Sequence, residues 1–267
     1  MPVAKGAAKA RESEELVEAD VPATVVCAHC GDADCPGCLN EITRSGVVAV
    51  VPWERPGTSS WTRLWATARA TTFDADRFFE TLPDGPLAPA LRFAVVSEMI
   101  ASTAMGLLLF VPLAVLAPGW VKHLLLDEGG LLLRLAVAGI PALAALLVAA
   151  HVAHGWALDL GARRSGAPGK TTRALRFGLY ATGWDLVIGP LGAVVVAVKE
   201  GLRASLSIAG VGMGLPGRSA RAFLRGAYGL QGASAQPALR ASYAAAVVAT
   251  AVGAIAVIGA IVAVLMI

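Results

Sequence analysis

RFGLYATGWDLVIGPLGAVVVAVKEGLRASLSI, residues 176–208, is the stretch that decides how the rest of the chain is interpreted. It is long and mostly apolar, Gly189-Pro190 interrupts it, and it carries Asp185, Lys199 and Glu200. A soluble domain rarely exposes so much apolar surface, and a lone transmembrane helix rarely carries three charges. We therefore expect two short spans joined by a tight Gly-Pro turn inside a helical membrane bundle.

Composition supports a membrane protein. Of the 267 residues, 56% are hydrophobic and 15% are charged, which is far from the usual soluble mixture. Residues 1–89 are mixed, whereas the apolar residues concentrate after them. The first twenty residues have no apolar core of a signal peptide. We therefore expect the first span to act as the targeting signal and the segment before it to stay in the cytoplasm.

The N-terminal region divides into a tail and a cysteine module. Residues 1–26 are rich in Ala, Glu and Lys and predict a flexible tail. Residues 27–53 predict a zinc-ribbon-like module, because all four cysteines form two C-x-x-C pairs there: Cys27, Cys30, Cys35 and Cys38. Four thiolates suit a closed, structural tetrahedral zinc site, and metal binding would fold a segment too small to have its own core.

Two alternatives to this zinc site stay open. The cysteines could form redox dithiols or disulfides, although adjacent pairs in a reducing cytoplasm more often bind metal. The linker between the two pairs is short, so His29, Asp32 or Asp34 could replace one thiolate. The run 47–53, VVAVVPW, predicts one short strand beside the metal.

Residues 54–89 predict two amphipathic interfacial helices. The first follows a Ser59 cap and places Trp61, Leu64, Trp65 and Ala68 at helical spacing. It suits a helix on the membrane surface, with packing against the protein itself as the alternative. The second, 74–83, ends at its proline and turns Phe78, Phe79 and Leu82 towards the bundle or the lipid.

Residues 90–267 predict a domain of five spans, at roughly 90–117, 131–158, 173–188, 191–211 and 241–265. We expect a polar turn over 118–130, a kink at Pro141 and a basic connector over 212–240 with a short surface helix over 218–228. Five spans and a cytoplasmic N-terminus put both basic clusters inside, at 163–176 and 218–240, as the positive-inside rule requires. The alternative, one long span over 174–198, would put the second cluster outside.

Charged residues within the spans are the clearest functional signal: Glu98, Asp185, Lys199 and Glu200. Ionisable groups there usually face a partner, a cavity or a pathway. We expect a buried pair, Asp185–Lys199 or Glu98–Lys199, that fixes helix packing, with a proton or ion relay as the alternative. His151 and His154, with Asp159 further on, offer a second possible ligand set for a metal, although histidines near a span end are more often polar packing groups.

This order of features resembles the Yip family of five-span membrane proteins, the Rab-interacting type, in its bacterial form. The resemblance covers roughly residues 50–265 and rests on PWE at 52–54, DRFFETLP at 76–83, RALRFGLYATGWDLVIGPLG at 173–192, the short hairpin and GVGMGLPGRSARA at 210–222. It implies a non-enzymatic integral membrane protein that interacts with other membrane proteins. Eukaryotic members bind small GTPases, but no residue pattern here carries that property over.

Two functions follow as hypotheses. The first is a scaffold in a bacterial cytoplasmic membrane whose zinc module recruits a protein partner. The second is a small ion or solute transporter or channel that uses the intramembrane charges and the broken hairpin. The sequence has no phosphate loop, dinucleotide fingerprint or nucleophile elbow, so we expect no enzyme, and its basic loops suit anionic lipid rather than nucleic acid. Small residues on the helices leave self-association open.

Overall fold

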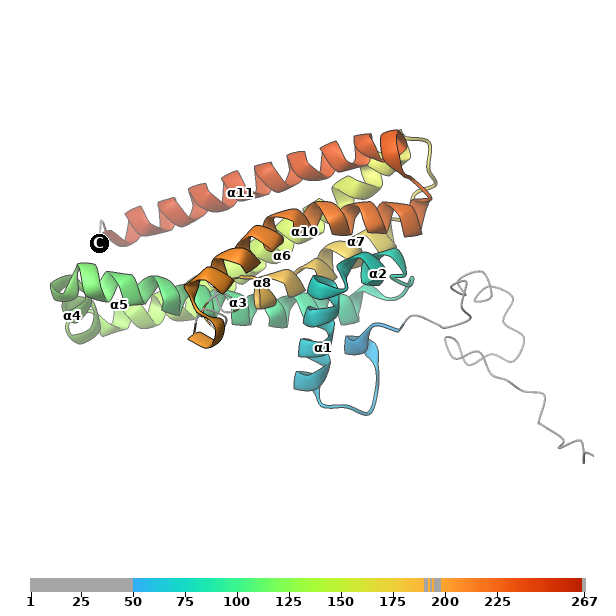
Figure 1. The fold of residues 1–267 in the computed structure, drawn as a ribbon. Helices are drawn as coiled ribbons and strands as arrows, with labels where there is room; N and C mark the ends of the chain where they lie inside the picture. Colours follow the sequence, from blue (N-terminus) through green and yellow to red (C-terminus); the bar gives the residue numbers. More distant parts are fainter. Residues whose placement is uncertain (1–49, 190–191, 193, 195–197, 266–267) are drawn as a thin grey trace, which may run out of the picture. The chain divides into compact units, whose positions relative to one another are not determined.

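A computed structural model describes residues 50–189, 192, 194 and 198–265. Every regular element in these ranges is helical (Figure 1), which agrees with the expected all-α class for this part of the chain. The strand predicted over 47–53 is wrong for the residues from 50 onwards. Pro52–Glu54 instead forms a turn of 3-10 helix, η2, because a proline with fixed φ suits the first position of a helical turn.

The two short helices before the first long one form as predicted. In α1 (Ser60–Phe73) the Ser59 hydroxyl oxygen accepts a hydrogen bond from the backbone N–H of Thr62 at 3.1 Å, so the serine cap is confirmed. Leu64 and Ala68 are buried while Trp61 is 60% exposed. The inner face of α1 therefore packs against the protein, as the alternative had it. In α2 (Ala75–Glu80), Phe79 faces the core.

The first long helix, α3 (Leu87–Leu116), covers the first predicted span. The polar turn expected next is wrong over α4 (Pro118–Leu126), because a proline opens this helix and Val121 and Leu124 are buried. Then come α5 (Gly129–Arg134), a π-helical turn η3 (Leu135–Gly139) and α6 (Ile140–Arg164). Pro141 lies in the first turn of α6, where its missing N–H is not needed, and the π turn precedes it.

The apolar stretch over residues 176–208 does not form one helix. Helices α7 (Thr171–Ala181) and α8 (Gly183–Val187) form its first arm, which ends just before Gly189. A second break falls at Gly201, whose φ of +88° favours glycine. Residues 174–198 are therefore not one continuous helix, and the predicted span 191–211 is not one either, because Gly201 interrupts it.

After Gly201 the chain is more regular than expected. Helix α10 (Leu202–Tyr228) runs unbroken into the predicted connector, 212–240, as far as Tyr228 and contains Pro216, so the expected surface helix over 218–228 is only its last part. Gly229 ends it in the left-handed conformation. A short 3-10 turn, η4 (Gly232–Ala235), leads into α11 (Gln236–Leu265), which covers the last predicted span.

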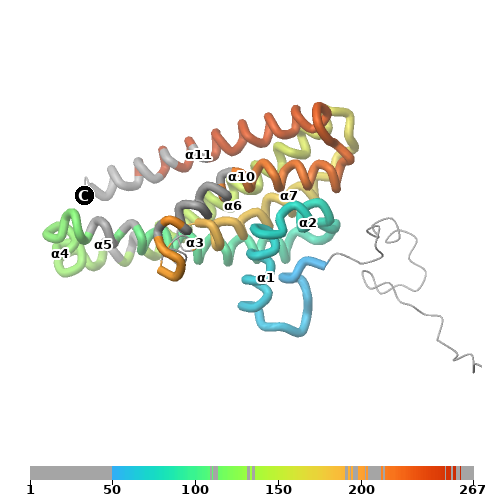
Figure 2. Tube along the Cα trace, viewed as in Figure 1, coloured from blue at the N-terminus to red at the C-terminus, as the bar shows by residue number. Residues whose placement is uncertain are grey.

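The core is aromatic and lies where α6 meets the shorter helices. Helix α6 contacts α3, α7 and α11, and Figure 2 traces these segments through the bundle. Phe177 on α7 packs its ring against Phe79 of α2 and Phe223 of α10, each with ring centroids 4.7 Å apart. Residues far apart in the sequence therefore fix α2, α7 and α10 together.

Apolar side chains also remain exposed on the helices after α2. The most exposed of them include Val115, Leu116, Val247, Val248 and Ile255 on the long helices α3 and α11, and Leu126, Leu133 and Val137 on the short elements between α3 and α6. Two helical segments in the described ranges are long and apolar enough to cross a membrane, Leu87–Leu108 and Ala136–Arg164. Scattered apolar residues are normal on soluble surfaces, but so many on neighbouring long helices favour a lipid environment.

Candidate functional site

Close contact between α6 and α7 sets the position of the site. Gly155 of α6 and Gly178 of α7 lie where the two helices touch. A Cβ atom at Gly178 would collide with the backbone oxygen of His151, and one at Gly155 with the backbone oxygen of Ala174. Glycine is therefore required for this approach, as at close crossings of membrane helices. The approach brings His151 beside α8, which contains Asp185.

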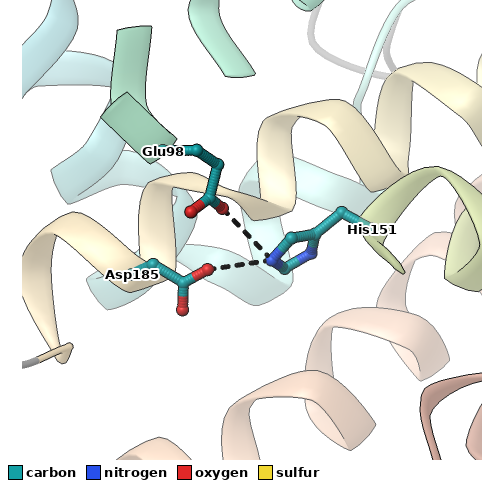
Figure 3. Close-up of side chains that lie close together, drawn as sticks. All are labelled: Glu98, His151 and Asp185. Atoms are coloured by element: carbon teal, nitrogen blue, oxygen red, sulfur yellow. Dashed lines mark hydrogen bonds and ion pairs between the residues drawn. The ribbon is translucent and has the colours of Figure 1, made fainter. Parts of the chain in front are cut away.

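Three side chains from three helices meet there: Glu98 of α3, His151 of α6 and Asp185 of α8 (Figure 3). The Nε2 atom of His151 lies 2.9 Å from Asp185 Oδ2 and 3.6 Å from Glu98 Oε1. One potential ligand atom from each residue lies within 4.8 Å of the other two. Figure 3 shows both carboxylates directed at the same ring nitrogen. We call these three residues the acid–histidine cluster.

Burial within the cluster is uneven. The Glu98 side chain is 0% exposed, that of His151 is 16% exposed and that of Asp185 is 36% exposed. Neither carboxylate oxygen of Glu98 has a hydrogen-bond partner. Among the described residues, no lysine or arginine forms an ion pair with Glu98 or Asp185. Two carboxylates therefore depend on one imidazole, and a buried charge without compensation is costly.

Trp184 supports the cluster from the side. Its indole Nε1–H donates a hydrogen bond to the backbone oxygen of Thr71 on α1 at 2.9 Å. Its ring meets the His151 ring edge-on, with centroids 6.0 Å apart. Gly183 beside it lets α8 approach α1 closely, because a Cβ there would collide with the Thr71 hydroxyl. Helix α1 thus fixes α8 and, through it, Asp185.

The structure brings together two of the four charged residues singled out in the sequence. Glu98 and Asp185 share His151, which differs from the expected pairing of either one with Lys199. Lys199 and Glu200 are exposed and lie just before the break at Gly201. Their expected place within a span stays a prediction, because exposure on the protein surface does not give a position relative to the membrane.

The second possible ligand set, His151 with His154 and Asp159, does not assemble. His154 is buried, stacks on Phe177 and hydrogen-bonds the Ser242 hydroxyl, so it is a polar packing group, as favoured for histidines near a span end. Asp159 accepts hydrogen bonds from the Lys170 backbone N–H, the Thr171 hydroxyl and the Tyr228 hydroxyl. Asp159 therefore joins the α6–α7 turn to the end of α10.

The PWE segment, residues 52–54, takes part in a second buried cluster of polar side chains. Arg176 is fully buried, donates to the backbone oxygen of Pro86 at 2.8 Å and pairs with Glu54 at 2.9 Å. The Tyr180 hydroxyl donates to the same Glu54 oxygen, Oε1, at 2.5 Å, and the Trp53 indole donates to the backbone oxygen of Pro89 at 2.9 Å. Arg176, expected among the basic residues facing the cytoplasm, is a structural residue.

The four cysteines, Cys27, Cys30, Cys35 and Cys38, lie outside the described residues, so their zinc site stays a prediction. Sequence reasoning found all three cluster residues but not their combination. The signal lay in the antiparallel order of α6 and α7, in which Gly155 faces Gly178 and residues earlier in α6 face residues later in the hairpin. Comparisons with protein-family models, with curated proteins and with solved structures gave no match.

Proposed function

We propose that the chain is a non-enzymatic, five-span scaffold protein of a bacterial cytoplasmic membrane, of the Yip type. Its N-terminus lies in the cytoplasm, and a zinc-binding module formed by Cys27, Cys30, Cys35 and Cys38 recruits a protein partner. The exposed apolar helices and the two candidate spans support the membrane location. The number of spans and the orientation rest on the charge distribution in the sequence.

The observation that carries the scaffold proposal is the way residues 51–82 attach to the long helices. Val51 is buried, so the chain is part of the packed core from this residue onwards. Asp76 and Glu80 of α2 pair with Arg218 and Arg225 of α10 at 2.6 Å each. The second pair is bidentate, with a further bond at 2.8 Å. These attachments make residues 51–82 part of the helical unit, which suits the anchor of a scaffold protein.

A comparison of co-purifying proteins tests this proposal. Intact chain and the Cys27→Ser/Cys30→Ser variant are isolated from membranes at equal abundance, with Ser45→Ala as a control that keeps every thiol. We expect a specific partner to be present with the intact chain and the control, and absent with the cysteine variant. The same set of partners from all three would contradict a recruiting module.

Ion transport is the second candidate function, and the acid–histidine cluster is the observation that favours it. Buried ionisable groups between membrane helices often mark ion pathways. The test is ion flux into liposomes that contain the intact chain or the Asp185→Asn variant. Flux that requires Asp185 would support transport. Equal flux through intact chain, variant and empty liposomes would remove this candidate.

A further inference from the structure

We propose that Glu98, His151 and Asp185 bind one divalent first-row transition-metal ion, such as Zn²⁺ or Mn²⁺. This site is separate from the zinc module expected at the cysteines, and it does not depend on the scaffold proposal. An ion bound at this site can serve structure or transport.

The spacing of the donor atoms fits a single ion. Three ligands about 2.0–2.2 Å from one tetrahedral ion lie roughly 3.4 Å from one another. The distances from His151 Nε2, 2.9 Å to Asp185 and 3.6 Å to Glu98, lie on either side of that value. Small side-chain rotations suffice to place the three atoms around one ion. One imidazole with two carboxylates leaves at least one position for water.

Charge and burial favour a cation over the ion-free arrangement. The Nε2 atom of His151 carries at most one proton, so it cannot satisfy both carboxylates. Glu98 is 0% exposed, and both of its oxygens lack a hydrogen-bond partner while pointing into the cluster. A divalent ion displaces the imidazole proton, neutralises both carboxylates and gives Glu98 the partner it lacks. Asp185, 36% exposed, provides the ion with an opening to the surface.

A second buried polar group without a hydrogen-bond partner lies near Glu98 in the sequence of α3. Ser102 follows Glu98 by four residues and therefore lies one turn along the same face of the helix. It is 1% exposed, and its hydroxyl oxygen has no hydrogen-bond partner. Glu98 is therefore followed, one turn along α3, by a second buried polar group without a partner.

The ligand set also indicates which metals bind. Calcium takes six to eight oxygen ligands and magnesium keeps several waters, so one imidazole with two carboxylates suits neither well. Imidazole and carboxylate suit Zn²⁺, Fe²⁺ and Mn²⁺, and no thiolate is present to select Cu⁺. Mn²⁺ is the more useful probe, because four thiolates bind it poorly while nitrogen and oxygen ligands accept it. It therefore reports this site even in the intact chain.

The experiment is a titration of the full-length protein with Mn²⁺ after treatment with a chelator, using electron paramagnetic resonance to count the free ion. Competition with Zn²⁺ at the same site is measured in parallel. We expect one Mn²⁺ per intact chain and an affinity at least about tenfold lower for Glu98→Gln, whose side chain keeps its size. Asp185→Asn should behave in the same way.

Two control variants make the result specific. His123→Gln removes an exposed histidine that also contacts an aspartate, Asp127, at 2.7 Å, and Cys27→Ser/Cys30→Ser disrupts the cysteine module. Both should keep the Mn²⁺ site. Equal Mn²⁺ binding by Glu98→Gln and the intact chain, or no binding by the intact chain, overturns the proposal. Partner capture by the cysteines is a separate measurement, so failure here does not count against the scaffold.

Discussion

At the scale of single residues, buried charges define this protein. Arg176 and Glu54 form a pair in which the arginine is 0% exposed and the glutamate 20% exposed, and Tyr180 completes it. Removing one partner of a buried pair leaves the other charge uncompensated, whereas an exposed pair contributes little. The two kinds of ion pair in this chain should therefore respond very differently to substitution.

We predict that Glu54→Ala destabilises the protein by about 3 kcal/mol, because Arg176 then keeps a buried charge with one backbone acceptor. Asp76→Ala removes an ion pair whose partners are 47% and 49% exposed, and should cost less than about 1 kcal/mol. Unfolding in detergent, followed by circular dichroism, compares the two. Equal losses would mean that the Glu54 pair is no more important than a surface contact.

Only part of this residue scale was predictable. The sequence marked Glu98 and Asp185 as costly charges, but it paired them with Lys199 because opposite charge was the only available criterion. The structure pairs them with His151 because the glycines at 155 and 178 bring α6 and α7 into contact. Arg176 was expected among the cytoplasmic cations because its charge was likewise the only available criterion. A charge pattern identifies which residues need a partner, but helix packing decides the partner.

At the scale of helices, apolar runs and capping residues predicted the elements well, and glycine contacts were predicted poorly. The Ser59 cap and the long apolar runs gave α1, α3 and α11, whereas α4 was missed because its charged residues suggested a turn. Among the small residues expected to allow close approach, Gly214 and Gly259 have nothing near them, whereas Gly212 lies against the Ile188 side chain and Gly253 against that of Leu146. The glycines in tight backbone contact lie elsewhere, because packing depends on the neighbouring helix and not on local composition.

Gly178→Ala should therefore destabilise the protein by about 1–3 kcal/mol or more, because the new methyl group meets the His151 backbone and α6 must move. Gly214→Ala on α10 has open space around it and should stabilise the protein by about 0.5–1 kcal/mol through helix propensity. Thermal unfolding of the two variants in the same detergent measures the difference. A neutral Gly178→Ala would show that the two helices are not in backbone contact.

The attachment of α2 to α10 should depend on pH through Glu80. Its hydrogen bonds with Arg225 hold its pKa below the ordinary value of 4.5. A folded-state pKa below the unfolded value gives stability that is present above that ordinary value and is lost as the pH falls through the folded pKa. The difference in stability between intact chain and Glu80→Gln should be constant from neutral pH to about pH 5 and shrink below about pH 4. Unfolding midpoints over this range measure it, and a difference that persists at pH 3 would contradict this role of Glu80.

At the scale of the whole molecule, the number of spans decides which residues share a compartment. The helix break before Gly189 favours two short arms over one long span. Five spans put Ser165, in the turn after α6, and Ser234, before α11, on the cytoplasmic side, with Glu128 opposite. The single long span leaves Ser165 and Glu128 on the same sides but moves Ser234 outside. Ser234 therefore discriminates between the two topologies.

We predict which of these three positions reacts with a thiol reagent from outside the cell. Ser165→Cys, Ser234→Cys and Glu128→Cys are made singly in a chain whose four native cysteines are replaced by serine. A thiol reagent that cannot cross the membrane is then added to intact cells. Glu128, which is exposed, should label at once, while Ser165 and Ser234 should label only after the cells are opened.

Immediate labelling at Ser234 together with protection at Ser165 would establish four spans and place the arginines that pair with α2 on the outer side. Glu80 and Asp76 would then have to lie there as well, on the same side as Arg225 and Arg218. Since α2 precedes the first span, that outcome would also require the N-terminus to be outside or the α2–α10 contacts to be absent in the membrane.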